Sequence, residues 1–77
     1  MSFQKIVTVN VYQEILDEYI EHVKMFNILF AKRHESDTYR NKAMEHHGKM
    51  QQIRSKLGLD VLVALERLTG KSIPVEL

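Results

Sequence analysis

The sequence contains no cysteine, a single proline and only three glycines. Without cysteine the chain forms neither disulfides nor a thiolate zinc site, and an oxidising compartment is not implied. A chain of 77 residues holds one domain, and a domain of this size buries only about 60% of its unfolded surface. Because such a core is marginal, we expect self-association to supplement it.

Long apolar runs and a large excess of one charge are also absent. No stretch approaches the roughly 20 apolar residues that cross a bilayer, and the N-terminus lacks the basic and apolar regions of a secretory signal. The formal net charge is +1, which is too small to attract nucleic acid or acidic lipid in bulk. We therefore expect a cytoplasmic protein without membrane contact.

Catalytic patterns are missing as well. The sequence has no cysteine nucleophile, no glycine-rich phosphate loop and no G-x-S-x-G elbow. The carboxylates of Asp17, Glu18 and Glu21 fall on a polar helix side, where solvent keeps them ordinary acids. A unit of two helices also provides no concave pocket by itself. We expect a protein that is not an enzyme and carries no cofactor.

The first part of the chain predicts a long helix preceded by an extended arm. The β-branched residues at positions 6–9 favour an extended conformation, so the arm is expected over residues 1–9. Asn10 can then act as the N-cap of a helix over residues 10–34. The polar run that follows predicts a turn, with Ser36 or Asp37 as the next N-cap.

A second apolar stripe follows the turn and recurs at alternating spacings of four and three residues. Its members are Tyr39, Ala43, His46, Met50, Ile53 and Leu57. Gly58 is typical of a helix end, yet Val61, Ala64, Leu65 and Leu68 continue the stripe in phase. We expect one helix over residues 37–69, with a break at Gly58 as the alternative. Pro74 then prevents helix in the tail, residues 70–77.

The short turn makes the two helices antiparallel neighbours, so the expected fold is an all-α helical hairpin. The first helix is mainly acidic and the second mainly basic, which predicts complementary flanks. The apolar arc of the first helix spans about 180°, roughly twice the width that a two-helix seam needs. We expect a second copy, forming a dimeric bundle, or another protein to cover the remainder. The alternative is that the arm and the tail fold over it.

Seven residues of this arc are the ones expected at a self-association or partner interface. They are Tyr12, Leu16, Tyr19, Ile20, Val23, Phe26 and Phe30. Near the end of the second helix, Leu59, Leu62 and Val63 lie off the stripe and make that end apolar nearly all round. This wider apolar surface adds to the expectation of a partner.

Basic side chains on the second helix are candidates for contact with a polyanion. Lys42, Lys49 and Lys56 recur at heptad spacing beside the seam, and Arg54 lies on its other flank. We expect these side chains to meet the acids of the first helix. Nucleic-acid binding is the alternative, because it requires such a row to stay unpaired.

Histidines raise the question of a metal site. Antiparallel pairing brings His22 close to His46 and His47, but no two histidines of one helix have the His-x3-His spacing. No acidic residue belongs to the seam, so we expect His46 to fill a core layer and no metal to bind. Protonation of a buried His46 at mildly acidic pH should loosen the core.

The sequence therefore predicts a small, non-catalytic protein–protein interaction module of regulatory, adaptor or inhibitor type. Its self-association through an amphipathic helix is part of this prediction. Small helical chains without cysteine are common among bacterial and phage accessory proteins, which is an analogy and no derivation. The alternative function is that of a transcription-regulatory protein that binds nucleic acid with the basic face of the second helix.

Overall fold

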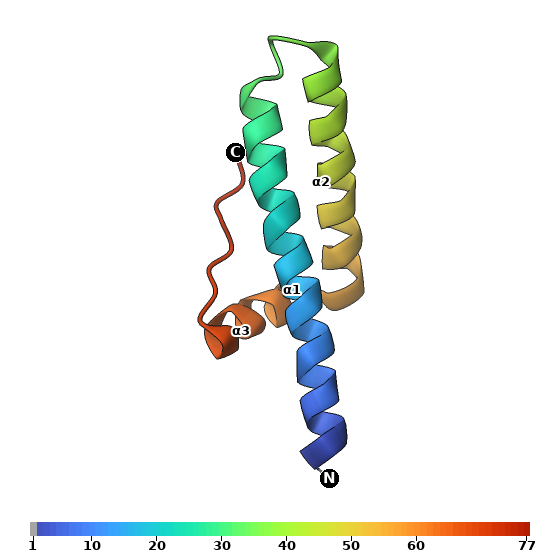
Figure 1. The fold of residues 1–77 in the computed structure, drawn as a ribbon, viewed down its shortest axis with the longest axis vertical. Coiled ribbons are helices and arrows are strands. Elements are labelled where there is room, and N and C mark those ends of the chain that lie inside the picture. Colours follow the sequence, from blue (N-terminus) through green and yellow to red (C-terminus); the bar gives the residue numbers. More distant parts are fainter. Residues whose placement is uncertain (1) are drawn as a thin grey trace.

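Three helices follow one another in the computed structural model, which describes the backbone of residues 2–77 and the side chains of residues 11–77. They are α1 (Ser2–Ala31), α2 (Asp37–Leu57) and α3 (Leu59–Thr69), and residues 2–77 contain no strand. Figure 1 shows α1 and α2 side by side and antiparallel, α3 folded back across their open end, and the tail returning along α1. The predicted all-α class and the packing of the first helix on the second are confirmed.

The helix α1 begins well before the position expected from the sequence. Residues 2–9 belong to α1 and form no extended arm, and Asn10 lies inside the helix instead of capping it. Strand propensity mainly reflects the fit to a pleated sheet surface, and no sheet is present among the described residues. A β-branched residue costs at most about 0.7 kcal/mol in a helix. Since no glycine or proline interrupts residues 2–31, the helix propagates through them.

A short turn over residues 32–36 connects α1 to α2. The helix α1 ends at Ala31, three residues earlier than expected. Ser36 has an extended backbone, and its hydroxyl accepts a hydrogen bond of 3.1 Å from the amide of Thr38. Because a serine at this position satisfies a free amide of the first turn, α2 begins directly after it. Of the two N-caps expected, Ser36 and Asp37, the structure has Ser36.

Gly58 separates α2 from α3, so the expected continuous helix is wrong and the alternative break is correct. Gly58 has φ +83° and ψ 152°, a conformation that L side chains rarely adopt. The break lets α3 turn back and bury Leu62 and Leu65. Burial contributes about 1.5–3 kcal/mol for each leucine, whereas glycine already weakens a continuous helix by about 1 kcal/mol.

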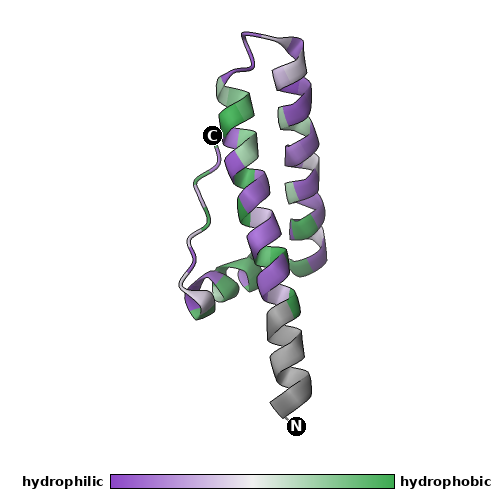
Figure 2. Ribbon diagram, viewed as in Figure 1, coloured by the Kyte–Doolittle hydropathy of each residue, from purple (hydrophilic) through white to green (hydrophobic). Residues whose placement is uncertain are grey.

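The core lies where α1, α2 and α3 meet. Ten apolar residues of the described chain are buried there: Leu16, Tyr19, Ile20, Val23, Phe26, Leu29, Ala43, Met50, Leu62 and Leu65. Most of them come from α1, whereas α2 contributes only Ala43 and Met50. The hydropathy colouring agrees, since α3 is largely hydrophobic and the outer side of α2 is hydrophilic (Figure 2). The wide apolar arc of α1 is therefore the centre of the fold.

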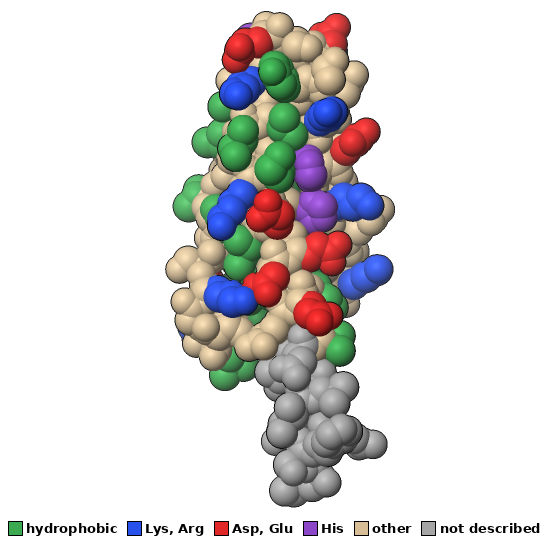
Figure 3. All heavy atoms as spheres, viewed as in Figure 1, with side chains coloured by type: hydrophobic (Ala, Val, Ile, Leu, Met, Phe, Trp, Pro, Cys, Tyr) green, Lys and Arg blue, Asp and Glu red, His purple; other side chains and the backbone are tan. Residues whose placement is uncertain are grey.

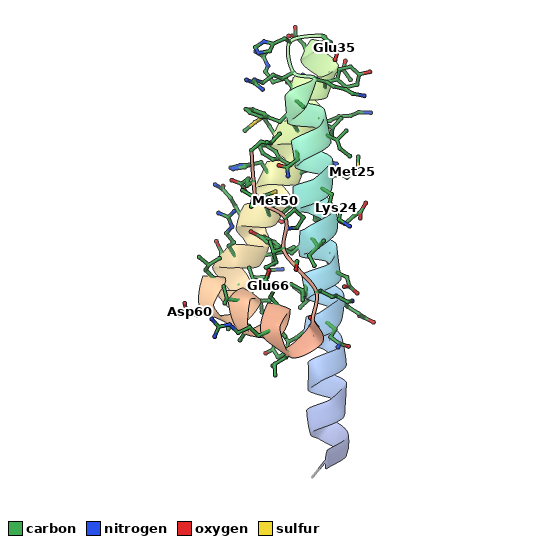
Figure 4. The ribbon with its side chains drawn as sticks, turned by 90° about the vertical axis from the view of Figure 1, so that its left-hand side faces the viewer. Lys24, Met25, Glu35, Met50, Asp60 and Glu66 are labelled. Atoms are coloured by element: carbon green, nitrogen blue, oxygen red, sulfur yellow. The ribbon has the colours of Figure 1, made fainter. Side chains whose placement is uncertain are left out.

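The tail, residues 70–77, has no regular secondary structure and is attached to α1 and α3 by polar contacts. The side chain of Asn27 donates to the carbonyl of Val75 at 2.9 Å and accepts from the amide of Leu77 at 3.0 Å. The carboxylate of Glu66 accepts from the amide of Ile73 at 2.6 Å, and Figure 4 shows Glu66 beside the tail. The tail is thus held along the side of α1 that α2 does not cover.

No helix of the described part of the chain combines the length and the apolar character that crossing a bilayer requires.

Candidate interaction surfaces

The apolar arc of α1 lies inside the single chain. Among the seven residues expected at an interface, Leu16, Tyr19, Ile20, Val23 and Phe26 are at most 9% exposed, and Tyr12 and Phe30 are half-buried. Leu62 and Leu65 of α3 belong to the same buried cluster, and Ile73 of the tail packs against it. The self-association prediction therefore lacks the free surface on which it depended.

The physical reason is the turn at Gly58. A straight second helix would have carried Leu62 and Leu65 past the end of the arc, whereas the folded-back α3 places them on it. The alternative that the arm and the tail fold over the arc is met only at Ile73 of the tail, because Leu62 and Leu65 belong to the segment expected to continue the second helix. The sequence identified the apolar residues of α1 but not the segment that covers them.

Among the described residues, α3 has more exposed large apolar side chains than α1 or α2. Leu59 is 60% exposed, Leu68 is 79% exposed, and Val61 and Val63 are each 37% exposed. At 100° per residue, Leu59 and Val63 lie on one side of the buried leucines and Val61 and Leu68 on the other. We call these four residues the apolar flanks of α3. A polar ridge between the flanks includes Asp60, which points away from the hairpin (Figure 4).

The lysines of α2 are exposed, but they do not form a separate basic surface. Within residues 11–77, Lys42, Lys49 and Lys56 make no ion pair, so the expected pairing with the acids of α1 is not observed. Figure 3 shows basic and acidic side chains interleaved over α1 and α2. Because neighbouring charges of opposite sign cancel at a distance, this face has a weak field for a polyanion.

A groove of about 260 Å³ lies between α1 and α2 beside two of these lysines. Its lining residues are Ile15, Glu18, Lys49, Gln52, Ile53, Lys56 and Leu57. The groove is slightly smaller than the roughly 300 Å³ at which small-molecule sites begin. The carboxylate of Glu18 also opposes the binding of an anion there.

Arg54 has a structural role that differs from the expected polyanion contact. Its Nε donates to the hydroxyl of Tyr19 at 2.8 Å, and its Nη2 donates to a carboxylate oxygen of Glu76 at 2.8 Å. The hydrogen bond with Tyr19 raises the pKa of Arg54 above its ordinary value, so the guanidinium is always a cation. Arg54 of α2 thus donates hydrogen bonds to both α1 and the tail, and its guanidinium is not free to bind a phosphate.

The histidines form a pair at the interface of α1 and α2. The Nδ1 atoms of His22 and His46 are 2.9 Å apart, so one ring donates and the other accepts. His22 Nε2 lies 3.8 Å from the carboxylate of Glu18, and the ring of His47 lies 5.3 Å from the ring of Phe26. Among the described residues, no group of three or more His, Cys, Asp or Glu is placed to hold a metal ion.

Two of the polar contacts were not anticipated from the sequence. The pairing of Tyr19 with Arg54 follows the antiparallel register of the hairpin, so the register was the signal that could have found it. The contacts of Asn27 with the tail had no such signal, because the tail has no periodic pattern.

Comparison with known proteins finds no family that matches the chain, no similar curated protein and no similar solved structure. The assignment of a function therefore depends on the geometry of the surfaces described above.

Proposed function

We propose that this protein is a non-catalytic protein–protein interaction module of regulatory, adaptor or inhibitor type, and that it binds its partner through the apolar flanks of α3. The observation that supports the proposal is the exposure of four large apolar side chains within a helix of 11 residues. Large exposed apolar side chains gathered on one short helix are typical of an interaction site.

The way in which α3 is attached suits a role in docking. Only Leu62 and Leu65 of α3 are buried, so its remaining surface is available to a partner. A helix that projects apolar side chains at spacings of three and four residues fits an apolar groove of another protein. Leu68, the most exposed member of the flanks, is the expected anchor, with Val61 on the same side of the helix.

A pair of charge substitutions tests this proposal. Leu68→Lys places a charge on α3, whereas Ile28→Lys places the same charge at an exposed apolar position of α1, where Ile28 is 52% exposed. Immobilised wild type and Ile28→Lys should both retain the same partner proteins from an extract of the native cells. Immobilised Leu68→Lys should not retain them. Equal retention by both variants, identified by mass spectrometry, would remove α3 as the docking element.

Nucleic-acid binding is the second candidate, and it is favoured by the lack of ion pairs at Lys42, Lys49 and Lys56 within the described residues. It predicts an affinity for duplex DNA that falls steeply with salt, with a slope set by the number of phosphates neutralised. The interleaved acids in Figure 3 oppose it. A salt titration with a labelled duplex distinguishes the two functions.

A further inference from the structure

The last part of the tail, residues 75–77, is held on α1 through its main chain. The side-chain amide of Asn27 donates to the carbonyl of Val75 and accepts from the amide of Leu77, and both groups lie on the same edge of an extended chain. The side chains of Val75 and Leu77 are 88% and 66% exposed, so they add little to the contact. Because other residues offer the same main-chain groups, Asn27 can hold an extended segment of many sequences.

The position of Asn27 in α1 agrees with this role. Asparagine is a weak helix former, because its side chain competes for main-chain hydrogen bonds. Among the described residues, the side chain of Asn27 forms hydrogen bonds only with the tail. Holding an extended main chain is therefore what this side chain contributes.

Arg54 supplies a second contact, which selects for charge. Its Nε donates to the hydroxyl of Tyr19, a buried residue of α1, and this bond does not involve the tail. Its Nη2 donates to the carboxylate of Glu76 at 2.8 Å. When residues 75–77 leave, the guanidinium is still oriented by Tyr19 and lacks a carboxylate. The surface beside Asn27 then favours a segment that carries an acidic side chain.

The two halves of the tail differ in how firmly they are attached. Ile73 packs against the core, its amide donates to the carboxylate of Glu66, and Lys71 forms an ion pair with Asp17. Residues 75–77, beyond Pro74, have only the contacts with Asn27 and the partly exposed ion pair of Arg54 with Glu76. Segments with few buried contacts open locally at low cost, so residues 75–77 can leave while residues 70–73 stay.

We propose that Asn27 and Arg54 form a binding site for an extended acidic segment of another protein, and that residues 75–77 occupy this site as a competitor built into the chain. The segment has Glu or Asp between two residues that bind Asn27 through a carbonyl and an amide, as Val75, Glu76 and Leu77 do. Figure 1 shows the tail running along α1, which is the path that the segment takes.

This inference goes beyond the proposed function, because the site shares no residue with the apolar flanks of α3. The tail also sets a threshold for binding. A tethered competitor acts at an effective concentration on the order of millimolar, so a foreign segment has to displace it. Partners with additional contacts to α1 therefore bind, whereas a short acidic segment alone binds weakly to the wild-type chain.

A peptide with the sequence of residues 72–77 is the probe, since the tail shows that this sequence fits the site. The peptide is capped at both ends, so the carboxylate of its glutamate is the only charge that Arg54 can bind. A second peptide carries Glu76→Gln. Binding is followed by NMR on the isotope-labelled full chain, through the side-chain N–H signals of Asn27 and Arg54.

Variants of the full chain separate the competitor from the site. Glu76→Gln weakens the hold on the tail, and Glu45→Gln is its matched control, since Glu45 is exposed and makes no ion pair with the described residues. Asn27→Ala, added to Glu76→Gln, removes the main-chain contact. Asn41→Ala, added in the same way at an exposed position of α2, is the control for it. Circular dichroism confirms that each variant is folded.

We expect the glutamate peptide to bind Glu76→Gln about threefold to fivefold more tightly than wild type or Glu45→Gln, because a partly screened ion pair no longer holds the tail. The peptide with Glu76→Gln should bind at least about threefold more weakly. Adding Asn27→Ala should weaken binding of the glutamate peptide, and adding Asn41→Ala should not.

Three results would overturn the proposal. They are equal binding of the two peptides to folded Glu76→Gln, equal binding by the Asn27→Ala and Asn41→Ala chains, and binding to Glu76→Gln that is absent or no tighter than to Glu45→Gln. Leu68→Lys should leave the peptide affinity unchanged. Failure of this proposal is therefore distinguishable from failure of the proposed function.

Discussion

Arg54 connects three segments of the chain through one guanidinium. It donates to Tyr19 of α1 and to Glu76 of the tail, and its own backbone belongs to α2. Its side chain is 38% exposed and that of Glu76 is 32% exposed, so solvent screens part of the attraction. The pKa of Arg54 is raised, which means that its contribution is lost only as pH rises through a value far above the physiological range.

We expect Arg54→Gln to lower the free energy of unfolding by about 1–2 kcal/mol, because hydrogen bonds to a charged group are lost and the site is partly screened. Lys56→Gln is the matched control, since Lys56 is exposed and makes no ion pair with the described residues. Its effect should stay within about 0.5 kcal/mol. Urea titrations at pH 7 measure both, and equal effects would show that the Arg54 contacts add no stability.

The pair of His22 and His46 connects α1 to α2. Their Nδ1 atoms are 2.9 Å apart, and one ring donates a hydrogen bond to the other. The ring of His47 lies beside the ring of Phe26 at the same interface.

We expect His46→Ala to lower the free energy of unfolding by about 1 kcal/mol, because a hydrogen bond between α1 and α2 is lost. His34→Ala, at an exposed position of the turn, should change it by no more than about 0.5 kcal/mol. Chemical denaturation compares the two variants. Equal effects would contradict a contribution of the histidine pair to stability.

At the level of elements, α3 depends on very few contacts. Leu62 is completely buried and Leu68 is 79% exposed in the same helix. We expect Leu62→Ala to lower the free energy of unfolding by about 2–5 kcal/mol and Leu68→Ala to change it by no more than about 0.5 kcal/mol. Thermal unfolding followed by circular dichroism compares them. If the two variants melt together, α3 does not pack as described.

The elements that local chemistry determines were predicted well. A turn without apolar residues and Ser36 as an N-cap place the connection between α1 and α2 correctly, because both signals act within a few residues. The start of α1 was predicted wrongly, and the break at Gly58 was predicted only as the alternative. At Gly58 the alternatives differ by the burial of Leu62 and Leu65 against α1, and a periodic pattern does not contain this tertiary contact.

The residues of the predicted interface could be selected from local signals, but their tertiary contacts could not. Periodicity selected Leu16, Tyr19 and Val23 as the apolar arc, and these residues are the buried centre of the fold. Whether the cover comes from the same chain or from another depends on where α3 turns, so the interface prediction could not be decided from the pattern. The role of Arg54 escaped prediction because Glu76 lies in a segment without periodicity.

The whole molecule is long and thin, with extents of 52 × 19 × 16 Å. Its radius of gyration is 14.4 Å, compared with about 11.5 Å for a compact domain of this length. An elongated shape exposes more surface for the same number of residues, so the core remains small. The proposed function concerns the surface that this shape leaves on the outside of α3.

The short turn over residues 32–36 also has a consequence for the order of folding. Closing so short a connection costs little entropy, so the contact between α1 and α2 can form before α3 packs on the hairpin. Until α3 has packed, the apolar side of α1 is open to other proteins.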